Sequence, residues 1–206
     1  MSAHPSWPPA SPLQLPGPDL VLRRQEPPHF RGVDLTWSVS FIVMAKMITG
    51  LKPRGFTWVI ADRLAVSERI GGNGFQHRRV RREEEITWLA GEAGINAIVS
   101  LLPANQNVTA YAEAGLDTHS VPVVNPVTRA DRDAIHATLD RALADPVARV
   151  LIHREVIDDS LAGVLGGYLL SSGLIDDPIL AVAVIQEILG RALGPAGRSL
   201  IPQDGV

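Results

Sequence analysis

The sequence predicts a single α/β domain with a central sheet flanked by helices. Two continuous apolar runs, "INAIVSLL" at residues 95–102 and "ARVLIH" at residues 148–153, are typical of strands buried on both faces. Segments with helical periodicity alternate with these runs, which favours a layered α/β arrangement. The length of 206 residues and the hydrophobic content of 46% are sufficient for one domain with a sizeable core.

Strands and helices are expected to alternate from Pro53 onwards. Apolar runs rich in β-branched and aromatic residues predict the strands, of which the third is interrupted by Pro122 near its end. The central helix places Ile135, Leu139 and Leu143 on one face, as an amphipathic helix requires. The predicted strands cover residues 56–60, 95–102, 118–124 and 148–153, and the predicted helices cover residues 83–94, 107–115, 128–145, 159–173 and 176–194.

Charge, proline and glycine mark the expected helix boundaries. The three glutamates at 83–85 are expected in the first turn of their helix, where the helix dipole favours negative charge, and Gly94 would end that helix. Asp177 is expected to cap the last helix and Pro178 to be its first helical residue. Gly194 is expected to follow the end of that helix.

An extended proline-rich arm is expected to precede the domain. Eight of the 16 prolines fall within the first 28 residues, and no apolar segment with a basic flank there resembles a signal peptide. The apolar run at residues 37–45 is shorter than the roughly 20 residues that span a bilayer, so no stable membrane insertion and a cytoplasmic location are expected. We expect a disordered arm at residues 1–52, a domain at 53–201 and a tail at 202–206. If Met44 is the true start of the protein, the arm is shorter.

The composition excludes several classes of chemistry. The chain contains no cysteine, so disulfides, thiolate metal sites and thiol nucleophiles are all excluded. The net charge is −3 and aromatic residues are not interleaved with the arginines, so no nucleic-acid partner is expected. No sequence motif indicates a cofactor or a metal site, and neither is expected.

Four phrases carry a resemblance to a known family. They are "PRGFTWVIADRLAVSERIG", "AGEAGINAIVSLL", "HSVPVVNP" and "VLIHREVIDDSLAGVLGGYLL", and they occur in this order between residues 53 and 170. In order and spacing they resemble the opening strand, the helix-strand step, the strand before the general-acid loop and the signature segment of the atypical dual-specificity phosphatases. These belong to the protein tyrosine phosphatase superfamily, and the resemblance implies a single protein-tyrosine-phosphatase-like domain over residues 53–201.

The resemblance also implies a catalytically degenerate member of that family. It places Arg154 at the position of the cysteine nucleophile, Ser160 at that of the phosphate-gripping arginine, and Asn125 at that of the general acid. The family's chemistry needs a thiolate, a guanidinium that grips phosphate oxygens and a carboxylic acid that gives up a proton. Because none of the three residues supplies its group, the resemblance implies a pseudophosphatase, without enzyme activity, that acts in binding, scaffolding or regulation.

Three interpretations remain open for residues 153–160, which begin at the end of the predicted strand and differ from the family's signature; this segment is called the altered loop. In the first, Arg154 pairs with a carboxylate of its own loop and fills the former phosphate site, while His153 makes a hydrogen bond that shapes the loop. In the second, the loop and its rim bind a partner that needs carboxylates, such as an arginine-bearing peptide or a cation, so that a protein partner is expected, or a small anionic ligand elsewhere on the surface. In the third, His153 and the loop carboxylates perform a non-thiolate reaction. The residues concerned are His153, Arg154, Glu155, Asp158, Asp159 and Ser160.

An arginine cluster provides an alternative site for an anionic ligand. The phrase "HRRVRREEE" at residues 77–85 contains four arginines within five residues. It is interpreted either as a solvated basic loop balanced by its own glutamates or as a site for a phosphorylated ligand. Two further arginines could add to the same surface, so the candidate anion-binding residues are Arg63, Arg69, Arg78, Arg79, Arg81 and Arg82.

Overall fold

The computed structural model describes residues 50–72 and 79–203, all of which lie in one compact unit, Ala45–Val206. The expectations for the proline-rich arm up to residue 49, for the apolar run at residues 37–45 and for Arg78 lie outside the described residues.

The core of the domain is a five-stranded sheet with the strand order β1-β2-β5-β3-β4. β1 runs antiparallel to β2, and the remaining neighbours are parallel. β5 is the central strand, and its Ile152 pairs with Val66 on one side and Val99 on the other. The strands are β1 (Thr57–Ile60), β2 (Leu64–Glu68), β3 (Ala97–Ser100), β4 (Asp117–Ser120) and β5 (Val150–Arg154).

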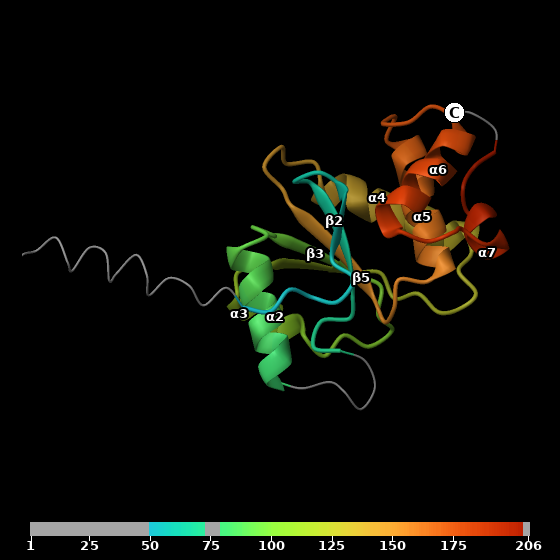
Figure 1. Cartoon of the computed structure of the whole chain (residues 1–206). Helices are drawn as coiled ribbons and strands as arrows, with labels where there is room; N and C mark the ends of the chain where they lie inside the picture. The colour runs from blue at the N-terminus through green and yellow to red at the C-terminus, as the bar shows by residue number, and fades with distance from the viewer. Residues whose placement is uncertain (1–49, 73–78, 204–206) are drawn as a thin grey trace, which may run out of the picture. The chain divides into compact units, whose positions relative to one another are not determined.

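Helices cover both faces of this sheet (Figure 1). The helices α2 (Arg79–Gly91) and α3 (Val108–Glu113) lie on one face, and the other face carries α4 (Arg129–Ala142), α5 (Asp159–Ser171), α6 (Pro178–Leu189) and the short α7 (Pro195–Arg198). Side chains alternate between the two cores: Val150 and Ile152 of β5 pack with the α4–α6 side, and Leu151 packs with the α2–α3 side. The predicted α/β class, with a sheet buried between two helical layers, is confirmed.

The first described helix begins one turn earlier than predicted. Arg79 pairs with Glu83, and Arg81 pairs with Glu85, in both cases with a nitrogen–oxygen distance of 2.7 Å. These pairs between residues four apart stabilise an additional helical turn. The glutamates therefore lie beyond the first turn, and the expectation that they begin the helix was wrong.

The last two helices show why glycine alone does not locate a helix end. Asp177 caps α6 and Pro178 is its first residue, as predicted. The helix ends at Gly190, which adopts a left-handed φ of 62°, and not at Gly194. Gly194 instead precedes α7, a helix that was not predicted.

β2 was also absent from the predicted elements. Its sequence, "LAVSE", is short and ends in polar residues, so it lacks the long apolar pattern of β3 and β5. Pairing with both β1 and β5 buries Leu64 and Val66 completely, and this long-range pairing makes the segment a strand.

Candidate functional site

The altered loop connects the central strand to a buried helix. β5 ends at Arg154, and α5 begins at Asp159. Asp158 has extended backbone angles and caps α5, since its side chain accepts a hydrogen bond from the amide of Leu161 at 2.8 Å. The predicted strand-loop-helix arrangement is confirmed, but of the residues assigned to the loop, His153 and Arg154 belong to the strand and Asp159 and Ser160 belong to the helix.

Arg154 is held in place by two side chains. Its Nη1 donates to Oδ2 of Asp158 at 2.7 Å, and its Nη2 donates to Oδ1 of Asn125, also at 2.7 Å. The Arg154 side chain is 8% exposed and that of Asp158 is 27% exposed. Of the three carboxylates that the sequence left open as partners, Asp158 is the one that pairs with Arg154, and Asn125, which the resemblance placed at the general-acid position, accepts from the same guanidinium.

The carboxylate of Asp158 occupies the part of the loop that favours an anion. Its Oδ1 accepts the Leu161 amide in the first turn of α5, and its Oδ2 accepts the guanidinium of Arg154. The N-terminus of a helix provides unpaired amide donors and a positive dipole end, which together attract anions. The Asp158 carboxylate therefore takes the hydrogen bonds from the Leu161 amide and the Arg154 guanidinium that an anionic ligand would otherwise take.

Asp159 has a different partner, far away in sequence. Its Oδ1 accepts the amide of Gly194 at 2.5 Å, and its Oδ2 accepts the amide of Gly197 at 2.6 Å. Arg191 adds a hydrogen bond from Nη1 to the carbonyl oxygen of Ile157 at 2.6 Å. These three bonds attach the segment around α7 to the altered loop, and the sequence contained no signal for them.

The two remaining loop positions lie at its edge. Glu155 pairs with Nη1 of Arg69 at 2.7 Å, so of the six candidate arginines Arg69 reaches the loop directly. Ser160 is half-buried in the first turn of α5. A hydroxyl at Ser160 has neither the charge nor the planar fork with which an arginine grips a phosphate.

His153 is fully buried against the ring of Tyr111. The two rings meet edge to face with centroids 6.0 Å apart. Burial, reinforced by the positive charge of Arg69, lowers the pKa of His153 to about 3, so the imidazole is neutral at physiological pH. Neither ring nitrogen has a hydrogen-bond partner within the described residues, and the expectation of a loop-shaping hydrogen bond from His153 was wrong.

Acidification is expected to destabilise the protein through His153. The unfolded chain binds a proton near the ordinary pKa of 6.5 while the folded chain does not, so the stabilisation is complete above that pH and is lost as pH falls towards 3. The expected slope is about 1.4 kcal/mol per pH unit for this histidine. Denaturant unfolding across this range measures it. His153→Leu should reduce the slope, whereas Ser100→Ala, at the buried serine paired in register with His153, should retain it. An unchanged slope in His153→Leu would exclude this origin.

Arg63 lies at the end of the sheet where the parallel strands begin, and the loop lies at the end where they finish. Arg63 precedes β2, which runs parallel to β5, so it lies near the start of β5 while the loop follows the end of β5. Its guanidinium donates to the carbonyl oxygens of Leu143 at 2.7 Å, Asp145 at 2.8 Å and Ala148 at 3.0 Å, and also to that of Pro146. The expectation that Arg63 adds to the same anion-binding surface was wrong.

The arginine cluster is paired with glutamates of its own helix. Glu85 is fully buried and accepts both the Nε of Arg81 at 2.7 Å and the amide of Gly71 at 2.6 Å. Arg79 is highly exposed and pairs with Glu83. Nε of Arg82 is buried and has no hydrogen-bond partner among the described atoms. The described part of the cluster thus lies on a helix and stabilises it, and is not a loop.

Two absences hold for residues 50–72 and 79–203, the part of the chain that the structure describes. Within them, no group of three or more histidine, cysteine, aspartate or glutamate side chains is arranged to hold a metal ion. The helices of this region are also too short or too polar to cross a membrane.

The fold of this chain is similar to the folds of several solved phosphatase structures. The solved structures similar to this chain include kinase associated phosphatase with its catalytic cysteine replaced by serine, at 18% identity and a TM-score of 0.59, covering 73% of this chain and 93% of that one. The core catalytic domain of the PP-IP phosphatase SIW14 from S. cerevisiae, in complex with citrate, is 12% identical with a TM-score of 0.54, covering 74% and 86%.

Human DUSP28 is also similar to this chain, at 18% identity and a TM-score of 0.51, covering 73% of this chain and 92% of that one. No protein-family model matches the sequence, and a search of curated proteins found no match. The similarity at these identities concerns the fold, and at that level the resemblance seen in the sequence is confirmed.

Proposed function

We propose that this protein is a catalytically inactive phosphatase-like protein that acts by binding. The observation that supports the proposal most is the absence of cysteine from the chain, where the resemblance places Arg154 at the nucleophile position. A guanidinium remains protonated in proteins and cannot attack phosphorus as a thiolate does. Its two hydrogen bonds to Asp158 and Asn125 hold it within the protein.

The surroundings of Arg154 add to this proposal. Asn125 at the general-acid position carries an amide, which does not donate a proton to a leaving group as a carboxylic acid does. The carboxylate of Asp158 takes the place at the start of α5 that an incoming phosphate would need. A phosphate there would meet a negative charge and would have to displace an existing hydrogen bond.

The exposed edge of the loop is the surface proposed to meet a protein partner. Val156 is 43% exposed, and the side chain of Glu155 beside it is also 43% exposed while pairing with Arg69. The apolar side chain offers a partner surface to bury, and the ion pair offers it charged hydrogen-bonding groups. The alternative of a non-thiolate enzyme has less support, since His153 is buried and Asp158 and Asp159 already bind other groups.

The alternative of a phosphorylated ligand bound through residues 78–82 also has less support. Arg79 and Arg81 are paired with Glu83 and Glu85 in the same helix. A phosphate bound there would have to compete with these carboxylates.

Titration with tungstate, a stable mimic of phosphate, tests whether the loop still accepts an anion. The amide resonances of residues 155–161 are expected to stay unchanged, because Asp158 already occupies the site. Asp158→Ser keeps a capping side chain and removes the charge, so this variant should gain tungstate binding. Saturable shifts of the loop amides in the unmodified protein would contradict the proposal.

A further inference from the structure

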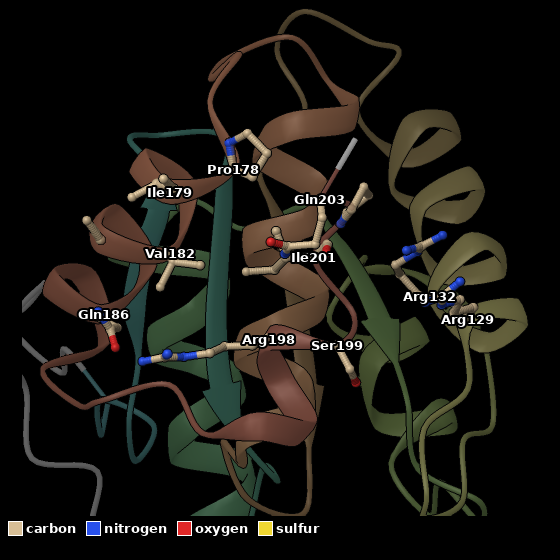
Figure 2. A pocket seen from close by; sticks show the side chains of 12 residues that line it. Arg129, Arg132, Pro178, Ile179, Val182, Gln186, Arg198, Ser199, Ile201 and Gln203 are labelled. Carbon is tan, nitrogen blue, oxygen red and sulfur yellow. Dashed lines mark hydrogen bonds between the residues drawn. The ribbon is translucent and has the colours of Figure 1, made fainter. Parts of the chain in front are cut away.

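A second concave surface lies apart from the altered loop, between α4, α6, α7 and the segment that follows α7. It encloses about 850 Å³. Figure 2 shows Ile179, Val182 and Gln186 on α6, Arg129 and Arg132 on α4, and Ile201 and Gln203 lying between them. Pockets that bind small molecules enclose about 300–1,000 Å³ and combine apolar walls with a few polar groups.

One wall of this pocket is apolar although it faces solvent. Ile179 is 80% exposed, and Val182 and Ala183 follow it at the spacing that places side chains on one helix face. Ala181 and Ile185 of α6 are buried in the core and Val182 is partly buried against it, whereas Ile179 and Ala183 on the pocket face are exposed. The apolar lining comprises Pro178, Ile179, Val182, Ala183, Ile201 and Pro202.

The charged groups of the pocket are all positive. The lining includes Arg129, Arg132 and Arg198 and no carboxylate among the described residues. Arg132 is paired with Asp133 and donates to the carbonyl of Leu200, so its charge is partly balanced. Arg129 and Arg198 therefore supply most of the positive charge, on a chain whose net charge is −3.

The position of Arg198 depends on the altered loop. Arg198 is the last residue of α7 and donates from Nε to the carbonyl oxygen of Leu193 at 3.0 Å. Asp159 holds the same segment through the amides of Gly194 and Gly197. One carboxylate of the altered loop therefore stabilises a wall of this second pocket.

We propose that this pocket binds a small organic anion with an apolar body. The carboxylate or phosphate of the ligand contacts Arg129, and its hydrocarbon part lies against Ile179 and Val182. Charge-assisted hydrogen bonds to arginine orient such a ligand, and burial of its apolar part adds affinity. The proposal is independent of the proposed function, because an active phosphatase could contain the same pocket.

Calorimetric titration of the full chain with four compounds tests the proposal. Decanoate and decyl phosphate, used below their micelle concentrations, represent the two anions. Decanol carries the same chain without charge, and inorganic phosphate carries the charge without the chain. We expect saturable binding of at least one of the two anions, with both neutral decanol and inorganic phosphate roughly tenfold weaker or more. The tighter of the two anions identifies the head group.

Surface variants locate the binding. Arg129→Gln and Ile179→Asn change exposed residues and are each expected to weaken binding by about fivefold to tenfold. Arg54→Gln and Leu174→Gln, at an arginine and a leucine outside the pocket whose exposed fractions are 70% and 56%, should leave binding unchanged. The absence of saturable binding by either anion, equal binding of decanol, or insensitivity to both pocket variants would each overturn the proposal.

Discussion

Replacing Gly163 with alanine is expected to destabilise the domain by about 3 kcal/mol. Gly163 lies in α5 where this helix meets α7, and a methyl group there would overlap the backbone carbonyl group and Cα of Gly197. A backbone cannot turn aside as the end of a flexible side chain can. The bonds from Asp159 to Gly194 and Gly197 also hold α7 in place, which limits its retreat.

Urea denaturation of the Gly163→Ala variant measures this effect. Gly91→Ala is the matched control, because it lies at the end of α2 and a methyl group there would have nothing within 4 Å. Alanine's higher helix propensity should leave that control unchanged or stabilise it by up to about 1 kcal/mol. If the two variants unfolded at the same urea concentration, the close contact between α5 and α7 would be wrong.

Breaking the Arg154–Asp158 pair should have the second largest effect. Arg154→Leu leaves the Asp158 carboxylate and the Asn125 amide without the guanidinium that now binds both. Removing one partner of a buried ion pair costs about 3–5 kcal/mol, and the partial exposure of Asp158 reduces the expected loss to about 2 kcal/mol.

A double-mutant cycle separates the ion pair from other effects of these changes. Asp158→Asn keeps a side chain that caps α5 and removes only its charge. The double variant Arg154→Leu/Asp158→Asn is expected to be more stable than the sum of the single losses predicts, by about 1 kcal/mol. Purely additive losses in chemical denaturation would show that the two side chains do not interact.

The sequence predicted the layered fold because the signals for it are local. The apolar runs around β3 and β5 and the cap formed by Asp177 and Pro178 act within a few residues. β2 was missed because its pairing with β1 and β5 involves distant segments. Without β2, Arg63 was expected on the wrong surface, because the direction of β2 decides at which end of the strands Arg63 lies.

The sequence named the residues of the candidate site but not the contacts between them. The spacing of the signature segment located Arg154, and the sequence around it offered three carboxylates as partners. Asp158 pairs with it because the start of α5 brings that side chain back over the strand end. Asp159 binds Gly194 and Gly197 instead, 35 and 38 residues along the chain. Only the folded arrangement of α5 and α7 distinguishes these two adjacent residues.

The central claim is that this phosphatase fold lacks phosphatase chemistry, and hydrolysis of p-nitrophenyl phosphate by the purified full chain tests it most directly. The expected rate equals that of a buffer blank, with or without vanadate. The Arg154→Cys/Ser160→Arg double variant shows whether the scaffold supports activity when the cysteine and arginine of the resembled family are introduced. Turnover by the unmodified protein above the blank, suppressed by vanadate, would contradict the claim and require a reaction without a cysteine.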